Sequence, residues 1–301
     1  MIAFEPRDAA ATRRAFRDAL AKGDGPLRLP GALSPLVARV VEEIGFEGVY
    51  LSGGALSAEL GMPDVGLTTL SEVAERAGRI ARATRLPLVV DADTGFGEAL
   101  NVVRTVQELE RQGVAGLHLE DQRNPKRCGH LGGKELVEAS EMERKLRAAA
   151  GARQDANTLL IARTDARAVE GLDAAIERAR AYLAAGADAI FPEALRDEGE
   201  FRTMRASIDA PLLANMTEFG KSPLLSRSTL RSLGYDMVIY PVTTLRLAMG
   251  AIERGLRQLD DEGSQEALVP EMQTRAQLYE LLLYKAHEAV DDAAYGGRDR
   301  S

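Results

Sequence analysis

The sequence has little cysteine and lacks long apolar runs. Cys128 is the single cysteine in 301 residues, and one cysteine can form neither an internal disulfide nor a thiolate-rich metal site. No stretch approaches the roughly 20 consecutive apolar residues that span a bilayer. The first residues, MIAFEPRDAAATRRAF, also lack the apolar centre of a signal peptide. We therefore expect a cytoplasmic protein that has no membrane partner.

The sequence also lacks an excess of positive charge. Its 46 Asp and Glu residues outnumber 38 Lys and Arg residues, giving a formal net charge of −8. An acidic chain is a poor partner for nucleic acid or for an anionic membrane surface. Hydrophobic residues make up 45% of the chain, so one large α/β domain or two ordinary domains could each bury a core.

A repeated pattern runs along the chain: a helix-like run, a glycine, a short apolar segment and then polar residues. It occurs in IGFEGVYLSG, RQGVAGLHLED, AAGADAIFPE and SLGYDMVIYP. The glycines Gly45, Gly113, Gly186 and Gly234 stand where a helix needs a left-handed cap. Similar apolar segments lie near residues 30, 90, 161 and 214. Continuous short apolar runs are typical of strands that are buried on both faces of a parallel sheet.

The eight strand candidates predict the fold class. Eight strands that alternate with helix patterns in about 230 residues favour an α/β fold of the (β/α)8 TIM-type barrel class. A doubly wound open sheet is the alternative, but it usually has fewer strands, and a glycine-rich phosphate turn is missing. We expect a single barrel domain over residues 1–301. Within it, residues 262–301 form a C-terminal helical extension, because no strand follows EALVPEMQTRAQLYELLLYKAHEAV.

Polar residues follow the predicted strands, where a barrel of this kind carries its active site. Among them are Ser52, Gly53, Gly54, Asp91, Asp93, Glu120, Asp121, Arg163, Asp165, Glu193, Asn215, Thr217 and Tyr240. Asp91 and Asp93 alternate along one strand, so we expect their carboxylates to point the same way. The alternative is that Asp91 caps the following turn while Asp93 is solvated. With Glu120, reached directly or through water, the pair predicts a Mg²⁺ site that Mn²⁺ could also occupy.

The segment PKRCGH, residues 125–130, places the only cysteine among cations. A lone cysteine is often just a small buried hydrophobe. The histidines are His118, His130 and His287, and only His130 lies near Cys128 in the sequence. A catalytic zinc is therefore not expected. His118 lies in an apolar strand, and either a core role or a functional role suits it.

The segments YLSGG, VDADTGFG, EDQ, PKRCGH, ARTDA, NMTEFG and MQTR follow one another in this order. Together they resemble the isocitrate lyase and phosphoenolpyruvate mutase superfamily, and within it the 2-methylisocitrate lyases, from about residue 25 to residue 290. The resemblance implies a magnesium-dependent carbon–carbon lyase of the oxo-acid-lyase type. Such an enzyme cleaves 2-methylisocitrate, a tricarboxylate, to pyruvate and succinate in the methylcitrate cycle of propionate catabolism.

Two alternatives to this activity stay open. One is a sister lyase that acts on 2,3-dimethylmalate or isocitrate, and the other is a non-catalytic barrel that binds dicarboxylates. Oxaloacetate decarboxylation and phosphonate mutase chemistry are less favoured, because superfamily members with those activities generally lack the KRCGH loop.

The resemblance also implies roles for single residues. Cys128 lies on a mobile loop and protonates the carbanion that bond cleavage leaves. We expect Lys126, Arg127 and His130 to lower the pKa of its thiol, and Gly129 to let the backbone approach the substrate. Tyr50 is the first choice for the base and a metal-bound hydroxide the second. The predicted catalytic set is Cys128, Tyr50, Arg163, His130 and Lys126. The predicted substrate contacts are Ser52, Gly53, Gly54, Cys128, Gly129, Arg163, Glu193, Asn215, Met216, Thr217, Arg246 and Arg275.

The resemblance finally implies an assembly. A helix is expected at about residues 270–288, with Leu278, Leu281, Leu282 and Lys285 near one face. Such an apolar stripe is too wide for a solvated helix. The helix could pack on its own barrel. The resemblance instead implies that neighbouring subunits exchange it, forming dimers that pair into a homotetramer, with Arg275 fixed in place by assembly.

Overall fold

The central feature of the fold is a closed ring of parallel strands. The computed structural model describes residues 8–295. Within them one sheet has the order β2-β3-β4-β5-β6 and the other the order β1-β8-β7. Single parallel bridges join Gly31 to Tyr50 and Ile190 to Leu212, which close the two gaps. The predicted barrel is therefore confirmed, and the open doubly wound sheet is wrong. The strands are β1 (Leu27–Pro30), β2 (Val49–Leu51), β3 (Leu88–Asp91), β4 (Gly116–Glu120), β5 (Leu159–Thr164), β6 (Ala189–Pro192), β7 (Leu213–Asn215) and β8 (Met237–Tyr240).

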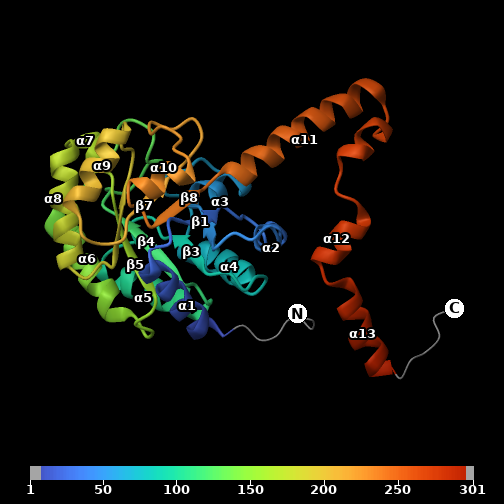
Figure 1. The fold of residues 1–301 in the computed structure, drawn as a ribbon, viewed down its shortest axis with the longest axis horizontal. Coiled ribbons are helices and arrows are strands. Elements are labelled where there is room, and N and C mark those ends of the chain that lie inside the picture. Colours follow the sequence, from blue (N-terminus) through green and yellow to red (C-terminus); the bar gives the residue numbers. More distant parts are fainter. Residues whose placement is uncertain (1–7, 296–301) are drawn as a thin grey trace. The chain divides into compact units, whose positions relative to one another are not determined.

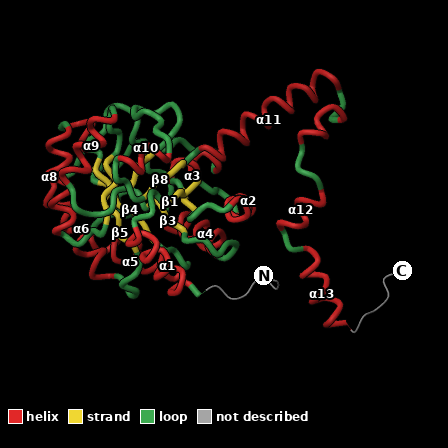
Figure 2. The backbone as a smooth tube through the Cα atoms, in the orientation of Figure 1, coloured by secondary structure: helices red, strands yellow, loops and turns green. Residues whose placement is uncertain are grey.

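Helices surround the strands of the compact unit Ala9–Leu245 (Figures 1 and 2). A loop connects each strand to the helix that follows it, as in βα units, and the loop between β4 and α6 is a long one. The helices of this unit are α1 (Ala9–Lys22), α2 (Pro35–Ile44), α3 (Gly53–Glu59), α4 (Leu70–Ala81), α5 (Ala99–Arg111), α6 (Ala139–Ala152), α7 (Ala166–Val169), α8 (Leu172–Ala184), α9 (Glu198–Ser207) and α10 (Arg227–Ser232).

Local signals in the sequence set where these helices begin and end. Ser34 caps α2 by accepting a hydrogen bond from the Val37 N–H, and Pro35 starts its first turn. Thr69 and Glu72 form a reciprocal capping box at the start of α4. The four glycines predicted to end helices all have left-handed backbones, for example φ +88° at Gly45. This prediction is confirmed.

Apolar side chains fill the interior of the barrel. Leu29, Val89, Ile161 and Phe191 belong to one buried cluster, which also contains Phe16 of α1. A second, larger cluster lies between the strands and the surrounding helices. Because the interior is packed rather than hollow, a ligand can be bound only at an end of the barrel.

The chain from Arg246 onward forms a separate compact unit. Helix α11 (Thr243–Glu262) leads into it without a break, and a 3₁₀ turn (Glu266–Glu271), α12 (Arg275–Leu281) and α13 (Tyr284–Tyr295) follow. The boundary between the two units lies between Leu245 and Arg246. The sequence pattern predicts the start of the extension later in the chain, at residue 262. Within the described residues, no helix is both long enough and apolar enough to cross a membrane.

The prediction of one helix over residues 270–288 is wrong. A capping box between Thr274 and Gln277 starts α12 at Arg275, five residues after the predicted start, and Leu283, with φ +52°, separates α12 from α13. A left-handed leucine cannot continue a right-handed helix. The rings of Tyr279 and Tyr284 stack across this break with their centroids 4.7 Å apart. The predicted apolar stripe is thus divided between a short helix and a bend.

Candidate active site

The carboxyl ends of the strands bring the predicted polar residues to one mouth of the barrel. Asp91 is the last residue of β3, and Glu120 is the last residue of β4. Arg163 is the second-last residue of β5, and Glu193 directly follows β6. All four side chains are buried. Buried charged groups persist only when they are paired or hold a ligand, so each needs a partner.

Arg163 is the centre of the charged network in the mouth. Its Nη1 lies 3.0 Å from Glu120 Oε2, and its Nε lies 3.0 Å from Asp165 Oδ2. Its Nη2 lies 3.6 Å from Glu193 Oε2. The guanidinium also lies over the Phe191 ring, 5.3 Å from its centroid. A guanidinium held by three carboxylates and a ring has a fixed orientation, which suits recognition of a substrate carboxylate.

Asp91 and Asp93 converge on Gly53, but not through strand alternation. β3 ends at Asp91, and Asp93 has a left-handed backbone with φ +47°. The Gly53 N–H donates to Asp91 Oδ2 at 3.1 Å. A Cβ added to Gly53 would lie 3.0 Å from Asp91 Oδ2 and 3.3 Å from Asp93 Oδ1. The two carboxylates therefore converge as predicted. The predicted reason, alternation along one strand, is wrong, because the turn after β3 brings them together.

The two aspartates differ in their affinity for protons. Burial and the charge of Asp91 raise the pKa of Asp93 to about 6. Burial also disfavours the Asp91 carboxylate, but the positive charges of His118, when protonated, Lys126 and Arg163 outweigh it and lower the pKa of Asp91 to about 2. Burial raises the pKa of Glu120 well above its ordinary value. The mouth therefore carries more carboxylate than its own cations neutralise.

Lys126 pairs with two carboxylates at the mouth. Its ammonium lies 2.7 Å from Asp93 Oδ1 and also pairs with Asp64. Asp64 was not among the predicted site residues. It lies in the loop GMPDVG between α3 and α4, away from any strand end, so only the fold brings it to Asp93. A search restricted to strand ends could not have found it.

The loop that carries Cys128 lies over the mouth. The Lys221 N–H donates to His130 Nδ1 at 2.9 Å, so Nε2 carries the proton that faces Glu193 Oε1 at 3.0 Å. The backbone of Gly129 packs so closely that an added Cβ would lie 2.5 Å from Arg163 Nη2. The backbone of Gly129 thus lies close to Arg163 and Glu193, and its approach to the substrate stays a prediction.

The expectation that nearby cations lower the pKa of Cys128 is wrong. Burial raises the pKa of the thiol and outweighs the hydrogen bond from the His130 backbone N–H. The charge of Lys126 is paired with Asp64 and Asp93. A raised pKa keeps the proton on sulfur at neutral pH, which suits an acid better than a nucleophile.

Tyr50 and His118 form a buried pair below the mouth. The Tyr50 hydroxyl lies 2.8 Å from His118 Nε2. Burial and the charge of Asp91 raise the pKa of Tyr50 well above its ordinary value. Burial lowers the pKa of His118 to about 4, so its ring is neutral at neutral pH. His118 lies in the barrel interior, as a core histidine would, and it also contacts the predicted base.

Some of the other predicted substrate contacts already bind neighbouring groups of the protein, and others lie at the mouth. Ser52 caps α3 through its hydroxyl, and the Gly53 N–H is occupied by Asp91, whereas Asn215 Nδ2 donates to Glu193 Oε2 at 3.2 Å. Gly54 and Thr217 also lie at the mouth: an added Cβ at Gly54 would lie 3.3 Å from Asp64 Oδ2, and one at Gly220 would meet both Thr217 and His130. Met216 packs into the outer core, and its sulfur accepts the Leu225 N–H. Arg246 and Arg275 belong to the second compact unit, so their contact with substrate stays a prediction.

Comparison with known proteins agrees with this geometry. The family described as phosphoenolpyruvate phosphomutase matches residues 16–260. The chain belongs to this family. It is 59% identical over 285 residues to a protein of Corynebacterium glutamicum named probable 2-methylisocitrate lyase 1, covering 94% of this chain and 93% of that relative. The predicted resemblance is therefore confirmed.

Solved structures of family members share the fold. The crystal structure of 2,3-dimethylmalate lyase, described as a PEP mutase/isocitrate lyase superfamily member, matches with a TM-score of 0.88 at 34% identity over 98% of each chain. A phosphonopyruvate hydrolase solved in complex with oxalate and Mg++ matches with a TM-score of 0.86 at 31% identity, covering 94% of this chain and 99% of that one.

The family's magnesium site can be tested against the residues of this chain. Among residues 8–295, no three His, Cys, Asp or Glu side chains form a group that could hold a metal ion by themselves. Mg²⁺ usually takes only one or two protein carboxylates and keeps several waters. Glu120 Oε1 is buried and accepts no hydrogen bond, whereas Asp93 Oδ1 and Glu120 Oε2 are also buried and face only the cations of Lys126 and Arg163, at 2.7 and 3.0 Å. These residues therefore fit a partly hydrated cation.

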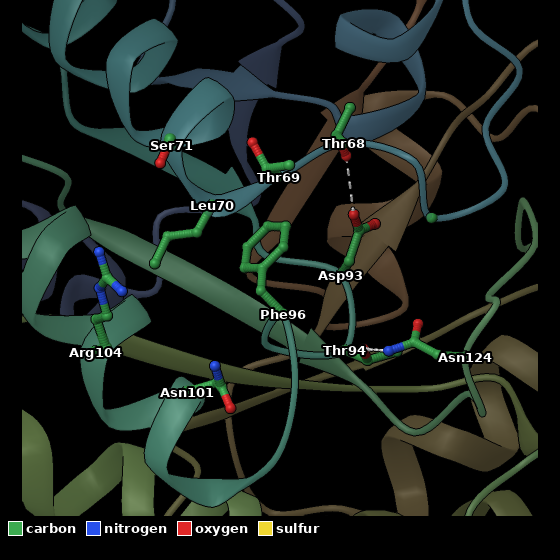
Figure 3. A pocket seen from close by; sticks show the side chains of 11 residues that line it. Thr68, Thr69, Leu70, Ser71, Asp93, Thr94, Phe96, Asn101, Arg104 and Asn124 are labelled. Carbon is green, nitrogen blue, oxygen red and sulfur yellow. Dashed lines mark hydrogen bonds between the residues drawn. The ribbon is translucent and has the colours of Figure 1, made fainter.

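A polar pocket adjoins this carboxylate group (Figure 3). It has a volume of about 390 Å³ and is lined by Gly66, Thr68, Thr69, Leu70, Ser71, Asp93, Thr94, Phe96, Asn101, Arg104 and Asn124. In Figure 3 the Thr68 hydroxyl points to Asp93, and Asn124 points to Thr94. The pocket is large and polar enough to hold several waters, and of the three candidate metal ligands only Asp93 lines it.

Proposed function

We propose that this chain cleaves 2-methylisocitrate to pyruvate and succinate with the help of Mg²⁺. The observation that carries the proposal is the position of Cys128, whose half-buried thiol lies on a loop over Arg163 and Glu193. A thiol that keeps its proton at neutral pH is suited to protonate a carbanion. The identity of 59% to a 2-methylisocitrate lyase supports the same substrate.

In this proposal Asp91, Asp93 and Glu120 hold Mg²⁺, with Mn²⁺ as a substitute and Glu120 acting through water. The cation would lower the pKa of the substrate hydroxyl and stabilise the developing keto acid. Lys126 and Asp64 orient the carboxylate of Asp93 from the opposite side. Outer partners of this kind fix the direction of a ligand's lone pairs.

The residues of the chain then bind the substrate and move two protons. Arg163, Asn215 and Thr217 bind substrate carboxylates, with Arg246 and Arg275 completing the set. Ser52 and Gly54 face the pyruvyl half, and Gly53 supports Asp91. Tyr50 takes the hydroxyl proton while its own proton passes to neutral His118. Cys128 Sγ donates a proton to the carbanion of the succinate half, and His130 keeps the loop in place through Glu193.

We also propose that residues 1–301 act as a single barrel domain with a helical extension, and that the protein is a cytoplasmic homotetramer whose subunits exchange C-terminal helices. No residue of α11 is buried within the single chain, although Leu247, Ile252 and Leu256 are large and apolar. A free catalytic thiol suits a reducing compartment. Deletion of residues 270–301 should abolish assembly and activity together, as light scattering and turnover would show. A truncated monomer with wild-type kcat/KM would contradict the exchange.

One assay tests the activity. Initial rates are measured with 2-methylisocitrate, isocitrate and 2,3-dimethylmalate, each with Mg²⁺ and each with excess EDTA. We expect the highest kcat/KM with 2-methylisocitrate and none above background in EDTA. A higher kcat/KM with 2,3-dimethylmalate would assign the sister reaction, while binding of all three acids without turnover would indicate a binding protein.

A further inference from the structure

The base of the loop that carries Cys128 is fixed by hydrogen bonds among the loop's own residues. Gln122 exchanges two hydrogen bonds with the backbone of Arg127, at 2.9 and 3.0 Å. The Arg123 N–H donates to the Glu135 carbonyl at 2.8 Å. These bonds hold the base whether or not the tip lies over the mouth. The tip, which contains Cys128 and Gly129, is held by other contacts: His130 pairs with Glu193 on one side, and Lys134 binds the Gly129 carbonyl on the other.

Lys134 reaches from the far side of the loop to its tip. Its ammonium lies 2.5 Å from the Gly129 carbonyl and 2.5 Å from Asp165 Oδ1. The Lys134 side chain is 1% exposed and that of Asp165 is 0% exposed. A lysine ammonium has three donors, so it can bind a carbonyl and a carboxylate together. It thereby links the peptide next to the catalytic thiol to the end of β5.

Asp165 is itself a rigid anchor. Its backbone N–H donates to Asp121 Oδ1 at 2.9 Å. Its carboxylate accepts from Arg163 Nε at 3.0 Å and from Arg163 Nη2 at 3.3 Å. One carboxylate is therefore shared between the loop's lysine and the arginine proposed to bind substrate. Movement of the loop tip and orientation of Arg163 depend on the same group.

We propose that Lys134 is a positioning residue that fixes the Cys128 loop over the mouth and aligns it with Arg163 through Asp165. The inference rests on the proposed function, because it explains how the acid is placed rather than what it protonates. When the tip lifts, Lys134 loses both partners and returns to water. When the tip closes, two charge-assisted hydrogen bonds offset the cost of burying the ammonium. Lys134 itself touches neither substrate nor reacting atoms.

A purely structural ion pair would behave differently. Removing such a pair would lower the free energy of unfolding and would leave the exposure of Cys128 in the folded state unchanged. The chain offers a matched control for this case in Arg13 on α1. Arg13 is also a buried cation that binds carbonyls, those of Val114 and Glu110, and a carboxylate, that of Asp155. It lies at the amino end of the barrel, away from the mouth.

The experiment compares Lys134→Met, Lys134→Arg and Arg13→Met in the full-length protein. The first readout needs no turnover: the rate at which iodoacetamide alkylates Cys128 without ligand. We expect Lys134→Met to raise that rate at least about tenfold, because the loss of a charge-assisted hydrogen bond shifts the open population by that factor. Lys134→Arg should restore part of the protection, and Arg13→Met should leave the rate unchanged while it lowers the urea midpoint.

The second readout is steady-state turnover of 2-methylisocitrate. A misplaced acid can cost about 100-fold in rate, so we expect that fall in kcat for Lys134→Met, with KM changed less than about threefold. Unchanged alkylation in folded Lys134→Met, or a loss of kcat no larger than that of Arg13→Met, would overturn the role of Lys134. Failure of the wild type to turn over 2-methylisocitrate would instead count against the proposed function, and the alkylation result would still test Lys134.

Discussion

Carboxylates lie at both ends of the barrel, but they differ in how many of their hydrogen bonds the protein itself supplies. At the amino end, Glu110 accepts hydrogen bonds from Thr158 Oγ1 and from the backbone N–H groups of Gln154 and Asp155. Asp188 likewise accepts from Arg17 and Arg153. At the carboxyl end, Glu120 Oε1 is buried and accepts no hydrogen bond, and Glu120 Oε2 has only the Arg163 guanidinium beside it, at 3.0 Å.

This difference distinguishes carboxylates that stabilise the fold from carboxylates that are available to a ligand. A buried carboxylate whose lone pairs are filled by the protein is complete and stabilises the fold. A buried carboxylate with unfilled lone pairs is costly and is retained where a ligand completes it. The charge at the mouth is therefore arranged for a cation and a substrate, and the charge at the amino end holds the strands together.

The largest effect is expected at the metal carboxylates. Asp91→Ala and Asp93→Ala should each lower kcat by about 10³-fold or more, since the charge stabilisation lost is worth several kcal/mol. Circular dichroism should show a folded barrel in both variants. EDTA should inactivate the wild type, and added Mg²⁺ should restore it. Full activity in excess EDTA would show that the unfilled oxygens serve another purpose.

The next effect concerns Cys128. General acids contribute about 10²- to 10⁴-fold in rate, and a serine hydroxyl is a far weaker acid than a thiol. Cys128→Ser should therefore lose kcat by that range while Mg²⁺ and product binding, measured by calorimetry, stay close to wild type. A serine variant with near-normal kcat would remove the thiol from the mechanism.

The amino end should respond in stability and not in chemistry. Glu110→Gln keeps the size of the side chain but removes its charge and half of its acceptor capacity. We expect a loss of about 1–3 kcal/mol in the free energy of unfolding, because buried donors lose their acceptor. The kcat of the folded variant should match the wild type. A large fall in kcat at unchanged stability would break the distinction between the two ends.

The smallest effect is the pH dependence of thiol alkylation. Only the thiolate reacts, and burial raises the pKa of Cys128. Its thiolate fraction at neutral pH is therefore below that of an ordinary cysteine and grows as the pH rises above the ordinary thiol range. Iodoacetamide should react with native enzyme more slowly than with glutathione at pH 7.5, with Cys128→Ser as the blank. Faster reaction than glutathione would indicate an activated thiolate and a different role.

Much of the fold follows from local rules that can be read in the chain. Short apolar runs, helix-ending glycines such as Gly113, and caps such as Ser34 each act over a few residues, so their positions determine the strands and most helices. The order of strand and helix then leaves few topologies other than a closed barrel. The strand ends also mark Asp91, Glu120 and Arg163, because chain order and parallel pairing bring them to one edge.

Other features were decided by the tertiary structure alone. Asp64 reaches Asp93 from a loop that no periodic pattern marks, and Lys126 pairs with these two carboxylates. The pKa of Cys128 is raised because the fold partly buries its thiol, an effect that the neighbouring residues of PKRCGH do not encode. Pattern and propensity act between residues close in sequence, whereas burial and charge pairing depend on distances in space that only the folded chain sets.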